Sequence, residues 1–298
     1  MNFNKIIVIG AGVIGSCYGA LLSEKNPVLM VDNNEIVDKI NKMGITIITD
    51  GEKKFFPTAK TQLEEIEQNT LILLTTKAHQ SKDAIQPIKN LFRDDTAILI
   101  LQNGVGNEEI VRKIVGDKIE VIRGIVNIGA GQIEPGKFNL ILKETVFEPT
   151  NTGGVIAKIF NVSRIPARIS QNFISELWQK LALNCVLNPL TAILKVRNYQ
   201  IAVPVLKELR HQIVKECISV SKAEGINLPA DLAQKIDNAI QGYTNFSSMY
   251  QDVVKGKTTE IDFLNGRIVE LAHKHKILTP CNEALTAIIK FMEPKNET

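Results

Sequence analysis

The chain of 298 residues is long enough for two domains of ordinary size. With 44% hydrophobic and 22% charged residues it has the composition of a globular protein, which excludes a disordered or fibrous one. Its 35 basic and 32 acidic side chains leave a net charge of +3, which is too small to indicate binding to nucleic acid or to a membrane surface.

The distribution of apolar residues and cysteines indicates a cytoplasmic protein. No apolar run approaches the about 20 residues of a membrane-spanning helix. The N-terminal residues lead directly into an apolar strand and leave no room for a signal peptide. The four cysteines form no C-x-x-C pair, which favours reduced thiols over disulfides or a metal site. The four histidines show no ligand spacing beyond His273 and His275, which cannot share a helix face, so we expect no metal ion.

The first half of the chain alternates short apolar runs with helical patterns. Nearly continuous apolar runs predict strands at 6–9, 28–31, 71–75, 97–101 and 120–122. Helical patterns lie between them at 13–24, 34–43, 79–91 and 107–115. This alternation is typical of a parallel sheet with right-handed crossovers. Residues 124–148 contain several glycines and one proline, and we expect them to form short strands that extend the same sheet in antiparallel fashion.

After about residue 168 the strand pattern stops. Apolar periodicity predicts helices at 171–188, 203–224, 229–241, 259–275 and 281–292. The sequence therefore predicts an α/β domain with a Rossmann-type, doubly wound parallel sheet over residues 1–168. An all-α C-terminal domain over residues 169–298 follows it.

A glycine-rich motif, Gly10-Ala11-Gly12-Val13-Ile14-Gly15, directly follows the first predicted strand and begins a helical pattern. In this arrangement one glycine makes the tight turn, another lets the backbone approach a pyrophosphate, and the third lets helix and strand pack closely. The free N–H groups of the helix N-terminus then face the phosphates. The motif predicts a dinucleotide site.

Asp32 ends the next predicted strand, about 20 residues after the motif, where a carboxylate accepts hydrogen bonds from an adenosine ribose. A carboxylate there repels the 2′-phosphate of NADP, and no arginine lies between Gly15 and Arg93. Asp32 therefore favours NAD(H). The alternative is that Asp32 only caps the helix that begins near Asn33 or Asn34.

Polar residues follow two further predicted strands. Lys77 follows the strand at 71–75, and Asn103 follows the strand at 97–101. Ligands of doubly wound sheets bind outside the carboxyl ends of the strands, so both residues are candidates for cofactor contacts. The alternatives are a solvated lysine on a loop and an ordinary Asn-Gly turn.

The predicted helix 171–188 places Lys180, Asn184 and Asn188 along one face, at steps of four residues. Lys180 and Asn184 lie within an apolar arc, where polar groups need partners. The alternative is a salt bridge from Lys180 to Glu176, four residues earlier. Pro189 is expected to end or bend this helix. Glu260 is expected in the first turn of the helix 259–275, where a carboxylate complements the helix dipole.

Together these segments resemble the ketopantoate reductase (2-dehydropantoate 2-reductase) family. The matching segments occur in the family's order along nearly the whole chain, at 10–15, 76–78, 102–104, 176–192, 247–249 and 260–262. The resemblance implies a Rossmann domain and a helical domain with the active site in the cleft between them. It also implies reduction of the C2 ketone of 2-dehydropantoate by hydride from a nicotinamide, in pantothenate biosynthesis.

The resemblance further implies roles for individual residues. Lys180 matches the family's general acid, which protonates the ketone oxygen. The groups that match substrate contacts are Asn103, Asn184, Asn188, Asn198 and Ser248. The groups that match cofactor contacts are the motif 10–15, Lys77, Asn103, Ala130 and Glu260, and the dinucleotide motif itself adds Asp32 as a candidate cofactor contact.

Asp32 departs from the family pattern, because the family mostly uses NADP(H) and carries a basic residue near this point. The resemblance thus implies NADP(H), whereas Asp32 favours NAD(H). A related NAD-dependent, mandelate-type 2-keto acid reductase on the same scaffold is the alternative function. A non-catalytic NAD(H)-sensing protein is a remote alternative, which the joint presence of Lys180 and its polar neighbours disfavours. Apolar helices in the second half are compatible with a homodimer.

Overall fold

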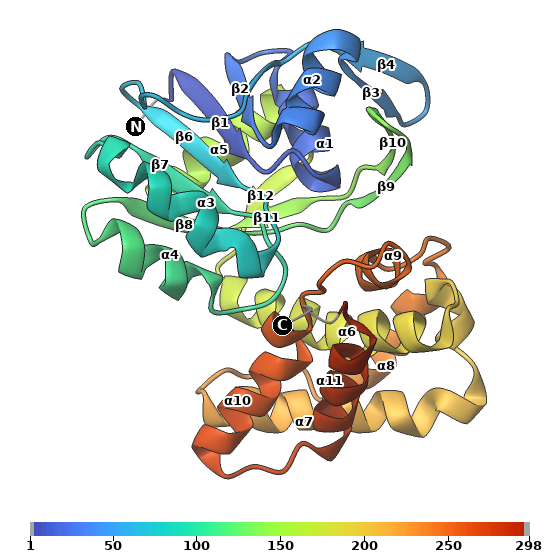
Figure 1. Cartoon of the computed structure of the whole chain (residues 1–298). Helices are drawn as coiled ribbons and strands as arrows, with labels where there is room; N and C mark the ends of the chain where they lie inside the picture. Colours follow the sequence, from blue (N-terminus) through green and yellow to red (C-terminus); the bar gives the residue numbers. More distant parts are fainter. Residues whose placement is uncertain (1–2, 295–298) are drawn as a thin grey trace. The chain divides into compact units, whose positions relative to one another are not determined.

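A computed structural model describes residues 3–294 as two units (Figure 1). The sheet unit comprises the chain up to Gln102 together with Gly106–Phe173, and the helical unit comprises Asn103–Val105 and the chain from Ile174 onward. None of the helices in residues 3–294 has the length and apolar character needed to cross a membrane.

The sheet unit contains twelve strands and five α-helices among the described residues. Its strands are β1 (Lys5–Ile9), β2 (Val28–Val31), β3 (Ile45–Ile48), β4 (Glu52–Phe55), β5 (Thr58–Lys60), β6 (Thr70–Leu74), β7 (Ala97–Ile100), β8 (Glu120–Ile125), β9 (Gly129–Glu134), β10 (Lys137–Ile141), β11 (Thr145–Phe147) and β12 (Ala167–Ile169). Its helices are α1 (Val13–Leu22), α2 (Asn34–Met43), α3 (Ser81–Ile85), α4 (Asn107–Val115) and α5 (Asn151–Val162), with the 3₁₀ turns η1 (Ala78–Gln80) and η2 (Gln86–Leu91).

The main sheet has the strand order β12-β11-β8-β7-β6-β1-β2-β5. Between β5 and β8 every pairing is parallel. Counting only these six strands along the chain, their order in the sheet is 3-2-1-4-5-6, which is that of the Rossmann fold. The predicted doubly wound parallel sheet is therefore confirmed. The strand order reverses between β1 and β6, which defines the edge where such sheets bind their ligands.

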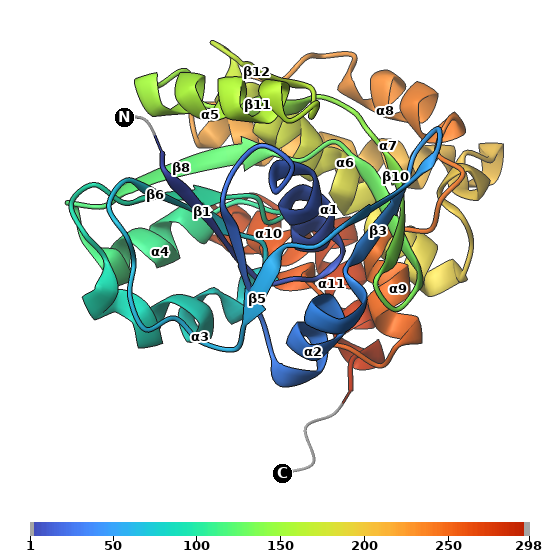
Figure 2. The same cartoon turned by 90° about the horizontal axis from the view of Figure 1, so that it is seen from above.

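The two faces of the sheet carry separate apolar cores. Alternate residues of β1, such as Ile6 and Val8, pack with α1, α2 and α5 on one face. The intervening residues Ile7 and Ile9 pack with α3 and α4 on the other. Figure 2 shows α5 and α3 on opposite sides of the sheet. Both faces of these strands are buried, which explains why the sequence shows continuous apolar runs rather than alternation.

The expectation for residues 124–148 is correct only in part. β11 extends the main sheet by pairing antiparallel with β8, as expected. However, β9 and β10 form an antiparallel hairpin in a second, four-stranded sheet of order β4-β3-β10-β9. Their partner β3 lies in the segment 45–60, for which the sequence analysis proposed no strands. Exposed residues on β4 and β9 weaken the apolar pattern there, so neither strand could be paired from sequence.

Two helical predictions in the sheet unit also differ from the structure. The predicted helix 79–91 is divided into η1, α3 and η2, because Pro87 cannot donate the backbone hydrogen bond that would continue α3. The amphipathic helix α5 was not predicted. Its start is marked by Thr150, whose hydroxyl accepts a hydrogen bond from the Gly153 backbone N–H.

The helical unit consists of α6 (Phe173–Leu194), α7 (Lys207–Ala223), α8 (Leu232–Gln241), α9 (Ser248–Val254), α10 (Asn265–His275) and α11 (Pro280–Met292). The 3₁₀ turns η3 (Asn198–Ile201), η4 (Pro204–Leu206) and η5 (Ile261–Phe263) connect them. The predicted all-α character is confirmed. Pro189 does not end α6, which continues to Leu194. The predicted helix 259–275 instead begins at Asn265, after Leu264 leaves helical geometry at φ −111° and ψ −105°.

A buried ion pair joins α7 to α8. Arg210 Nε donates to Asp237 Oδ1 at 2.6 Å, and His211 Nε2 lies 2.8 Å from Asp237 Oδ2. Arg210 Nη1 also donates to the carbonyl oxygens of Ile201 and Val203, at 2.5 and 3.0 Å. One guanidinium thereby holds the end of η3. Burial alone would raise the pKa of Asp237, but the hydrogen bonds from Arg210 and His211 outweigh it and the pKa is lowered.

We predict that Asp237→Asn lowers the free energy of unfolding by about 3 kcal/mol at neutral pH, because it leaves Arg210 buried beside a neutral group. A lowered pKa in the folded state contributes stability above the unfolded pKa of about 3.9, and this contribution is lost as pH falls through the folded value. The difference between wild type and variant should therefore narrow below about pH 4 in urea titrations.

Asp231→Asn is the matched control, since Asp231 forms an exposed pair with Lys235. It should cost less than about 1 kcal/mol at every pH. A difference for Asp237→Asn that widens as the solution is acidified would contradict this account.

Candidate functional site

The glycine turn, residues 10–15, joins β1 to α1. Gly10 has φ +96°, and a Cβ there would lie 2.6 Å from the Thr76 backbone nitrogen. A Cβ on Gly15 would lie 1.9 Å from the Gly10 carbonyl oxygen and 2.6 Å from Thr75 Oγ1. Backbone conformation and close packing within the protein therefore require glycine at both positions. The Thr75 hydroxyl fixes the turn further by donating to the Gly10 carbonyl oxygen at 2.7 Å.

Gly12 is different, because nothing within the protein requires a glycine there. Its φ of −65° suits any residue, and a Cβ would meet no protein atom within 4 Å. Gly12 is exposed, forms the N-cap of α1 without a capping side chain, and the first helical turn holds no acidic residue. An uncapped, uncharged helix N-terminus with no Cβ over it fits a pyrophosphate group. The residues present thus fit a bound dinucleotide.

Asp32 lies directly beside the glycine turn. Its Oδ2 accepts a hydrogen bond from the Ala11 backbone N–H at 2.6 Å, and its Oδ1 accepts one from the Asn33 backbone N–H at 2.7 Å. Helix α2 is capped by Asn33, whose side chain accepts from the Ile36 N–H at 3.2 Å. The alternative that Asp32 only caps this helix is therefore wrong. The carboxylate is half-buried and fixed at the carboxyl end of β2.

The loop after β6 carries Lys77 and is held by Gln102, a residue to which sequence reasoning gave no role. Gln102 is buried, and its Nε2 donates to the carbonyl oxygens of Thr76 and Lys77 at 3.0 and 3.2 Å. The same amide nitrogen lies 2.9 Å from the Ser81 hydroxyl. Gln102 directly follows the apolar strand predicted at 97–101, and a glutamine that is buried at a strand end must have hydrogen-bond partners. Its position after this strand was the signal available in the sequence. Gln102 is thus the link between the ends of β6 and β7.

Ala130, the remaining predicted cofactor contact of the sheet unit, lies in β9. It pairs with Leu140 of β10 and is half-buried against the core that includes α1. Ala130 therefore belongs to the second sheet, in the β9–β10 hairpin that was expected to extend the main sheet.

Within the helical unit, three predicted residues from distant parts of the chain come together. Asn103 Nδ2 donates to Glu260 Oε2 at 3.3 Å, and Asn184 Nδ2 lies 3.5 Å from Asn103 Oδ1. The turn after Asn103 packs closely, since Gly104 has φ +82° and a Cβ there would lie 2.2 Å from the Phe263 carbonyl oxygen. Glycine is therefore required at position 104 for this approach.

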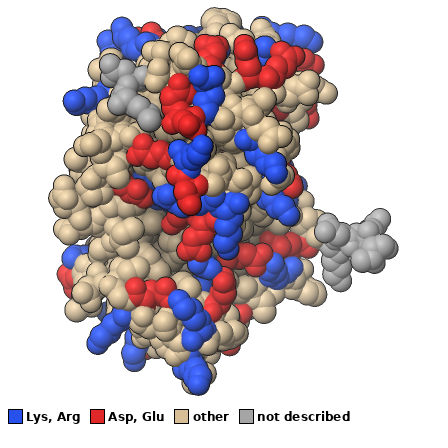
Figure 3. All heavy atoms as spheres, turned by 90° about the vertical axis from the view of Figure 1, so that its left-hand side faces the viewer, with Lys and Arg blue, Asp and Glu red and all other residues tan. Residues whose placement is uncertain are grey.

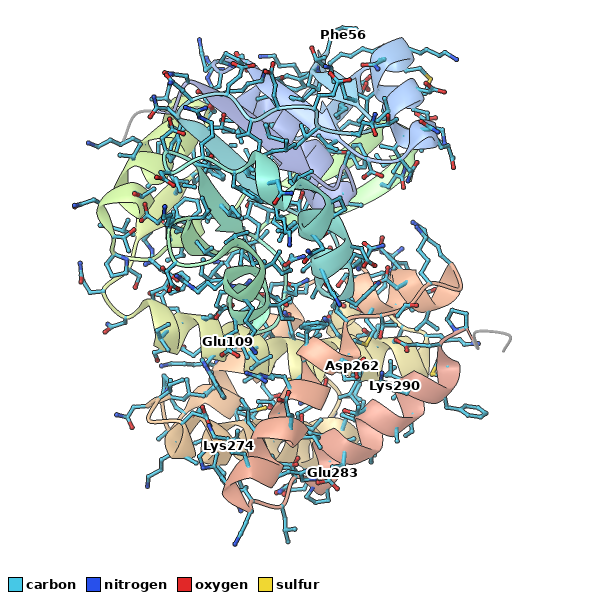
Figure 4. The ribbon with its side chains drawn as sticks, turned by 60° about the vertical axis from the view of Figure 1, so that its left-hand side comes forward. Phe56, Glu109, Asp262, Lys274, Glu283 and Lys290 are labelled. Carbon is cyan, nitrogen blue, oxygen red and sulfur yellow. The ribbon has the colours of Figure 1, made fainter. Side chains whose placement is uncertain are left out.

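Glu260 is buried, and the residues on both sides of it are tied to the end of α11. The Thr259 backbone N–H and hydroxyl donate to Glu293 Oε1 at 2.8 and 2.7 Å. Asp262 forms an ion pair with Lys290, and these two side chains lie beside each other in Figure 4. Glu260 precedes η5 and lies outside α10, so the expected position in a first helical turn is wrong. It is the N-cap residue of the short turn η5, and its Oε2 accepts the hydrogen bond from Asn103.

Lys180, Asn184 and Asn188 follow one another at four-residue steps on the continuous helix α6. Lys180 and Asn184 are half-buried, while Asn188 is 5% exposed. The predicted single helix face is therefore present.

Asn198 and Ser248 begin η3 and α9. Asn198 is buried, and its backbone N–H donates to the Asn245 carbonyl oxygen at 3.0 Å, which ties η3 to the segment before α9. Ser248, half-buried, follows Ser247, whose hydroxyl caps α9 and lies 2.7 Å from the Thr191 hydroxyl of α6. The structure thus links the elements that carry Asn188, Asn198 and Ser248. Among residues 3–294, no group of three or more His, Cys, Asp or Glu side chains is placed to hold a metal ion.

The sheet and its glycine turn define a dinucleotide-binding protein with an added helical unit. Residues 6–150 match the family model described as ketopantoate reductase PanE/ApbA, and residues 172–293 match the model described as ketopantoate reductase PanE/ApbA C terminal. The chain belongs to the ketopantoate reductase family.

Similar proteins extend over the whole chain. A 2-dehydropantoate 2-reductase from Pyrococcus horikoshii is 33% identical over 97% of this chain and 97% of its own length. The crystal structure of a ketopantoate reductase from Ralstonia eutropha has a TM-score of 0.89 at 28% identity, covering 97% of this chain and 98% of its own. A D-mandelate dehydrogenase solved with NADH and anilino(oxo)acetate has a TM-score of 0.88, also at 28% identity, over 97% and 98% of the two chains.

We predict that two alanine substitutions in the glycine turn affect different properties, one the binding of NADH and the other the stability of the fold. Gly12→Ala should leave the thermal unfolding midpoint within about 2 °C of wild type but weaken NADH binding at least about 10-fold, because the new Cβ points where a pyrophosphate would approach. Gly15→Ala should lower the free energy of unfolding by about 2 kcal/mol or more, since its Cβ overlaps the Gly10 carbonyl.

Fluorescence titration with NADH and thermal unfolding measure the two effects. A Gly12→Ala variant that binds NADH as wild type does would contradict the assignment of the glycine turn.

Proposed function

We propose that the protein reduces 2-dehydropantoate to pantoate with a reduced nicotinamide dinucleotide. The observation that carries the proposal is the cluster of Asn103, Asn184 and Glu260, one helical turn from Lys180 on α6. Lys180 is a proton donor, Asn103 and Asn184 are neutral amides, and Glu260 adds one acidic group. A proton donor beside neutral amides suits a keto acid substrate. The family membership supports the same reaction.

The cofactor, when bound, supplies the hydride that reaches the C2 carbon of the substrate. The glycine turn and the N-terminus of α1 hold its pyrophosphate, and Lys77 and Ala130 lie on the same unit for contacts nearer the nicotinamide. The sheet unit thus carries most of the proposed cofactor contacts, and the remaining two, Asn103 and Glu260, belong to the helical unit.

Lys180 supplies the proton. As negative charge develops on the C2 oxygen, the ammonium group stabilises it and transfers one proton to it, forming the hydroxyl of the product. Asn184, Asn188 and Asn198 orient the carboxylate and hydroxyl of the substrate. Because the amide side chains neither gain nor lose a proton near neutral pH, they orient the substrate without competing with Lys180 as proton donors.

For the cofactor we propose a preference for NADH over NADPH. The Asp32 carboxylate is fixed by Ala11 and Asn33 at the end of β2, where a second negative charge would be repelled. The nearest lysine of α2, Lys39, is engaged in an ion pair with Glu35. No arginine lies between residues 15 and 93 to hold a 2′-phosphate.

A second candidate is a mandelate-type 2-keto acid reductase. The D-mandelate dehydrogenase that this chain resembles was solved with NADH, and Asp32 favours the same dinucleotide. Such an enzyme would use the same proton donor with a different pocket lining. Parallel assays with 2-dehydropantoate and benzoylformate distinguish the two.

We also propose a cytoplasmic homodimer that acts on a small 2-keto acid and binds neither nucleic acid nor membrane. Basic and acidic side chains are interspersed on the face shown in Figure 3, in keeping with the small net charge. Exposed apolar residues of the helical unit, among them Leu194, Tyr199 and Val205, support a self-association surface. Analytical ultracentrifugation tests the dimer.

We predict that Lys180→Ala lowers kcat for 2-dehydropantoate reduction by about 10²- to 10⁴-fold, because no other group would donate the proton in its place. NADH binding should be unchanged, since the dinucleotide is held by the sheet unit. Oxidation of NADH followed by absorbance gives kcat. Lys222→Ala, an exposed lysine on α7, is the control and should keep wild-type activity. A Lys180→Ala variant with more than a tenth of wild-type kcat would refute the assigned role.

We predict that Asp32→Asn raises the ratio of kcat/KM for NADPH to that for NADH by about 10-fold, because it removes the charge that repels the 2′-phosphate. Asp38→Asn removes one charge from the exposed side of α2 and should leave the ratio within about 2-fold of wild type. A wild-type enzyme that prefers NADPH, with a ratio that Asp32→Asn does not change, would overturn the proposed preference.

A further inference from the structure

Helix α6 contains a proline in its C-terminal half and yet continues past it to Leu194. Pro189 has no backbone N–H, so the carbonyl oxygen of Cys185, four residues earlier, lacks the hydrogen bond that a helix normally provides. Both residues are buried. A buried carbonyl group without a donor is costly, so a donor from elsewhere is required for this helix to form.

Asn265 provides that donor. It is the first residue of α10 and is fully buried, and its Nδ2 donates to the Cys185 carbonyl oxygen at 3.0 Å. The same NH₂ group donates its second hydrogen to Asn282 Oδ1 at 2.9 Å. Asn282, on α11, is also fully buried. A residue 80 positions along the chain thus replaces the missing N–H of the helix.

The carboxylate of Glu216 sets the direction of this chain of hydrogen bonds. Glu216 is 3% exposed and accepts from Asn282 Nδ2 at 2.6 Å and from the backbone N–H groups of Cys281 and Asn282, both at 3.0 Å. A carboxylate only accepts, so the NH₂ group of Asn282 must face it and its oxygen must face Asn265. That oxygen in turn requires the NH₂ group of Asn265, whose other hydrogen is then directed to Cys185.

Glu216 is itself held by the N-terminus of α11. Pro280 is the first residue of that helix, and the next two N–H groups point at the carboxylate in place of a capping side chain. The helix dipole stabilises a negative charge at this position. Burial and the nearby Glu216 carboxylate raise the pKa of the Cys281 thiol to about 11.

The carbonyl that Asn265 holds lies between two proposed substrate contacts. Asn184 immediately precedes Cys185, and Asn188 immediately precedes Pro189. A proline removes one backbone hydrogen bond from a helix, so the partner of the freed carbonyl decides how this turn of α6 is held. The orientation of Asn188 relative to Asn184 and Lys180 therefore depends on Asn265.

We propose that Asn265, oriented by Asn282 and Glu216, is a positioning residue for ketone reduction: it replaces the helical hydrogen bond lost at Pro189 and so holds the turn of α6 between Asn184 and Asn188 in place. The effect on catalysis rests on the proposed function, whereas the hydrogen-bond replacement does not. Catalysis is sensitive to such geometry, because a displacement of about 1 Å in a positioned group costs about 10²-fold in rate.

The test is a double-mutant cycle between Asn265→Ala and Pro189→Ala. Pro189→Ala restores the backbone N–H that can donate to the Cys185 carbonyl, so it should make the Asn265 side chain unnecessary. The control is Pro204→Ala, because Pro204 is the first residue of η4, where a backbone N–H has no helical acceptor. Asn238→Ala, an exposed asparagine on α8, controls for loss of an amide.

We expect Asn265→Ala to lower kcat about 10- to 100-fold and to raise KM for 2-dehydropantoate, with NADH binding unchanged. Adding Pro189→Ala should bring kcat to within about 3-fold of the Pro189→Ala variant alone, whereas adding Pro204→Ala should restore nothing. If the alanine variant does not fold, Asn265→Ser, whose hydroxyl is shorter, takes its place in the cycle. An Asn265→Ala variant that is less stable but keeps wild-type kcat and KM would overturn the positioning role.

The same cycle separates this inference from the proposed function. If the wild-type protein does not reduce 2-dehydropantoate, the proposed function is refuted. The double-mutant cycle is then measured as free energies of unfolding in urea. Loss of stability in Asn265→Ala that Pro189→Ala reduces would support the hydrogen-bond replacement. Strictly additive losses would overturn it.

Discussion

The parallel arrangement of β1, β2, β6 and β7 is the constraint on which the cofactor side of this molecule depends. Parallel strands end at the same edge of a sheet, so the residues that follow them meet there whatever their distance in sequence. The glycine turn, Asp32 and Lys77 each follow one of these strands. Close packing reinforces the arrangement, because Gly10 lies against Thr76 at the point where the strand order reverses.

In the helical unit, polar residues are brought together in a different way. This unit has no sheet edge to bring polar residues together, and it must bury several of them among apolar helices. Several of the buried polar groups described above, among them Arg210, Glu216 and Asn282, are therefore paired with backbone groups or other side chains, as buried polar groups require. Arg210 holds the end of η3, and the end of α11 holds the segment around Glu260. The side chains proposed to bind substrate are thus carried on elements that are fixed by other polar groups.

Sequence patterns predicted the parts of the fold that rest on local, repeated signals. The apolar strands and the glycine turn needed only neighbouring residues to be recognised, and so did the row of Lys180, Asn184 and Asn188 on one helix. The second sheet could not be predicted in the same way, because β3 and β10 are far apart in the chain and their pairing is decided by tertiary packing.

The site shows the same division. Candidates such as Asp32, Lys77 and Lys180 were identified from type and position, whereas Ala130, Asn198 and Ser248 came from the resemblance to the family. The contact of Asp32 with Ala11 and the role of Gln102 depend on which strand ends meet. Asn265 gave no signal of its own in the sequence. Its partner is the carbonyl of Cys185, and backbone groups are identical in every residue. Only the proline four positions later indicated that a donor was needed, without indicating where it came from.

The short segment Asn103–Val105 belongs to the helical unit, although the residues on both sides of it belong to the sheet unit. The two halves of the gene product are therefore not separable parts. A helical fragment beginning after Phe173 would lack the hydrogen-bond partner of Asn184 and Glu260, and a chimaera that joined halves of two relatives would combine an asparagine from one with its contacts from the other. Any exchange of C-terminal halves that preserves these contacts has to keep Asn103 together with Asn184 and Glu260.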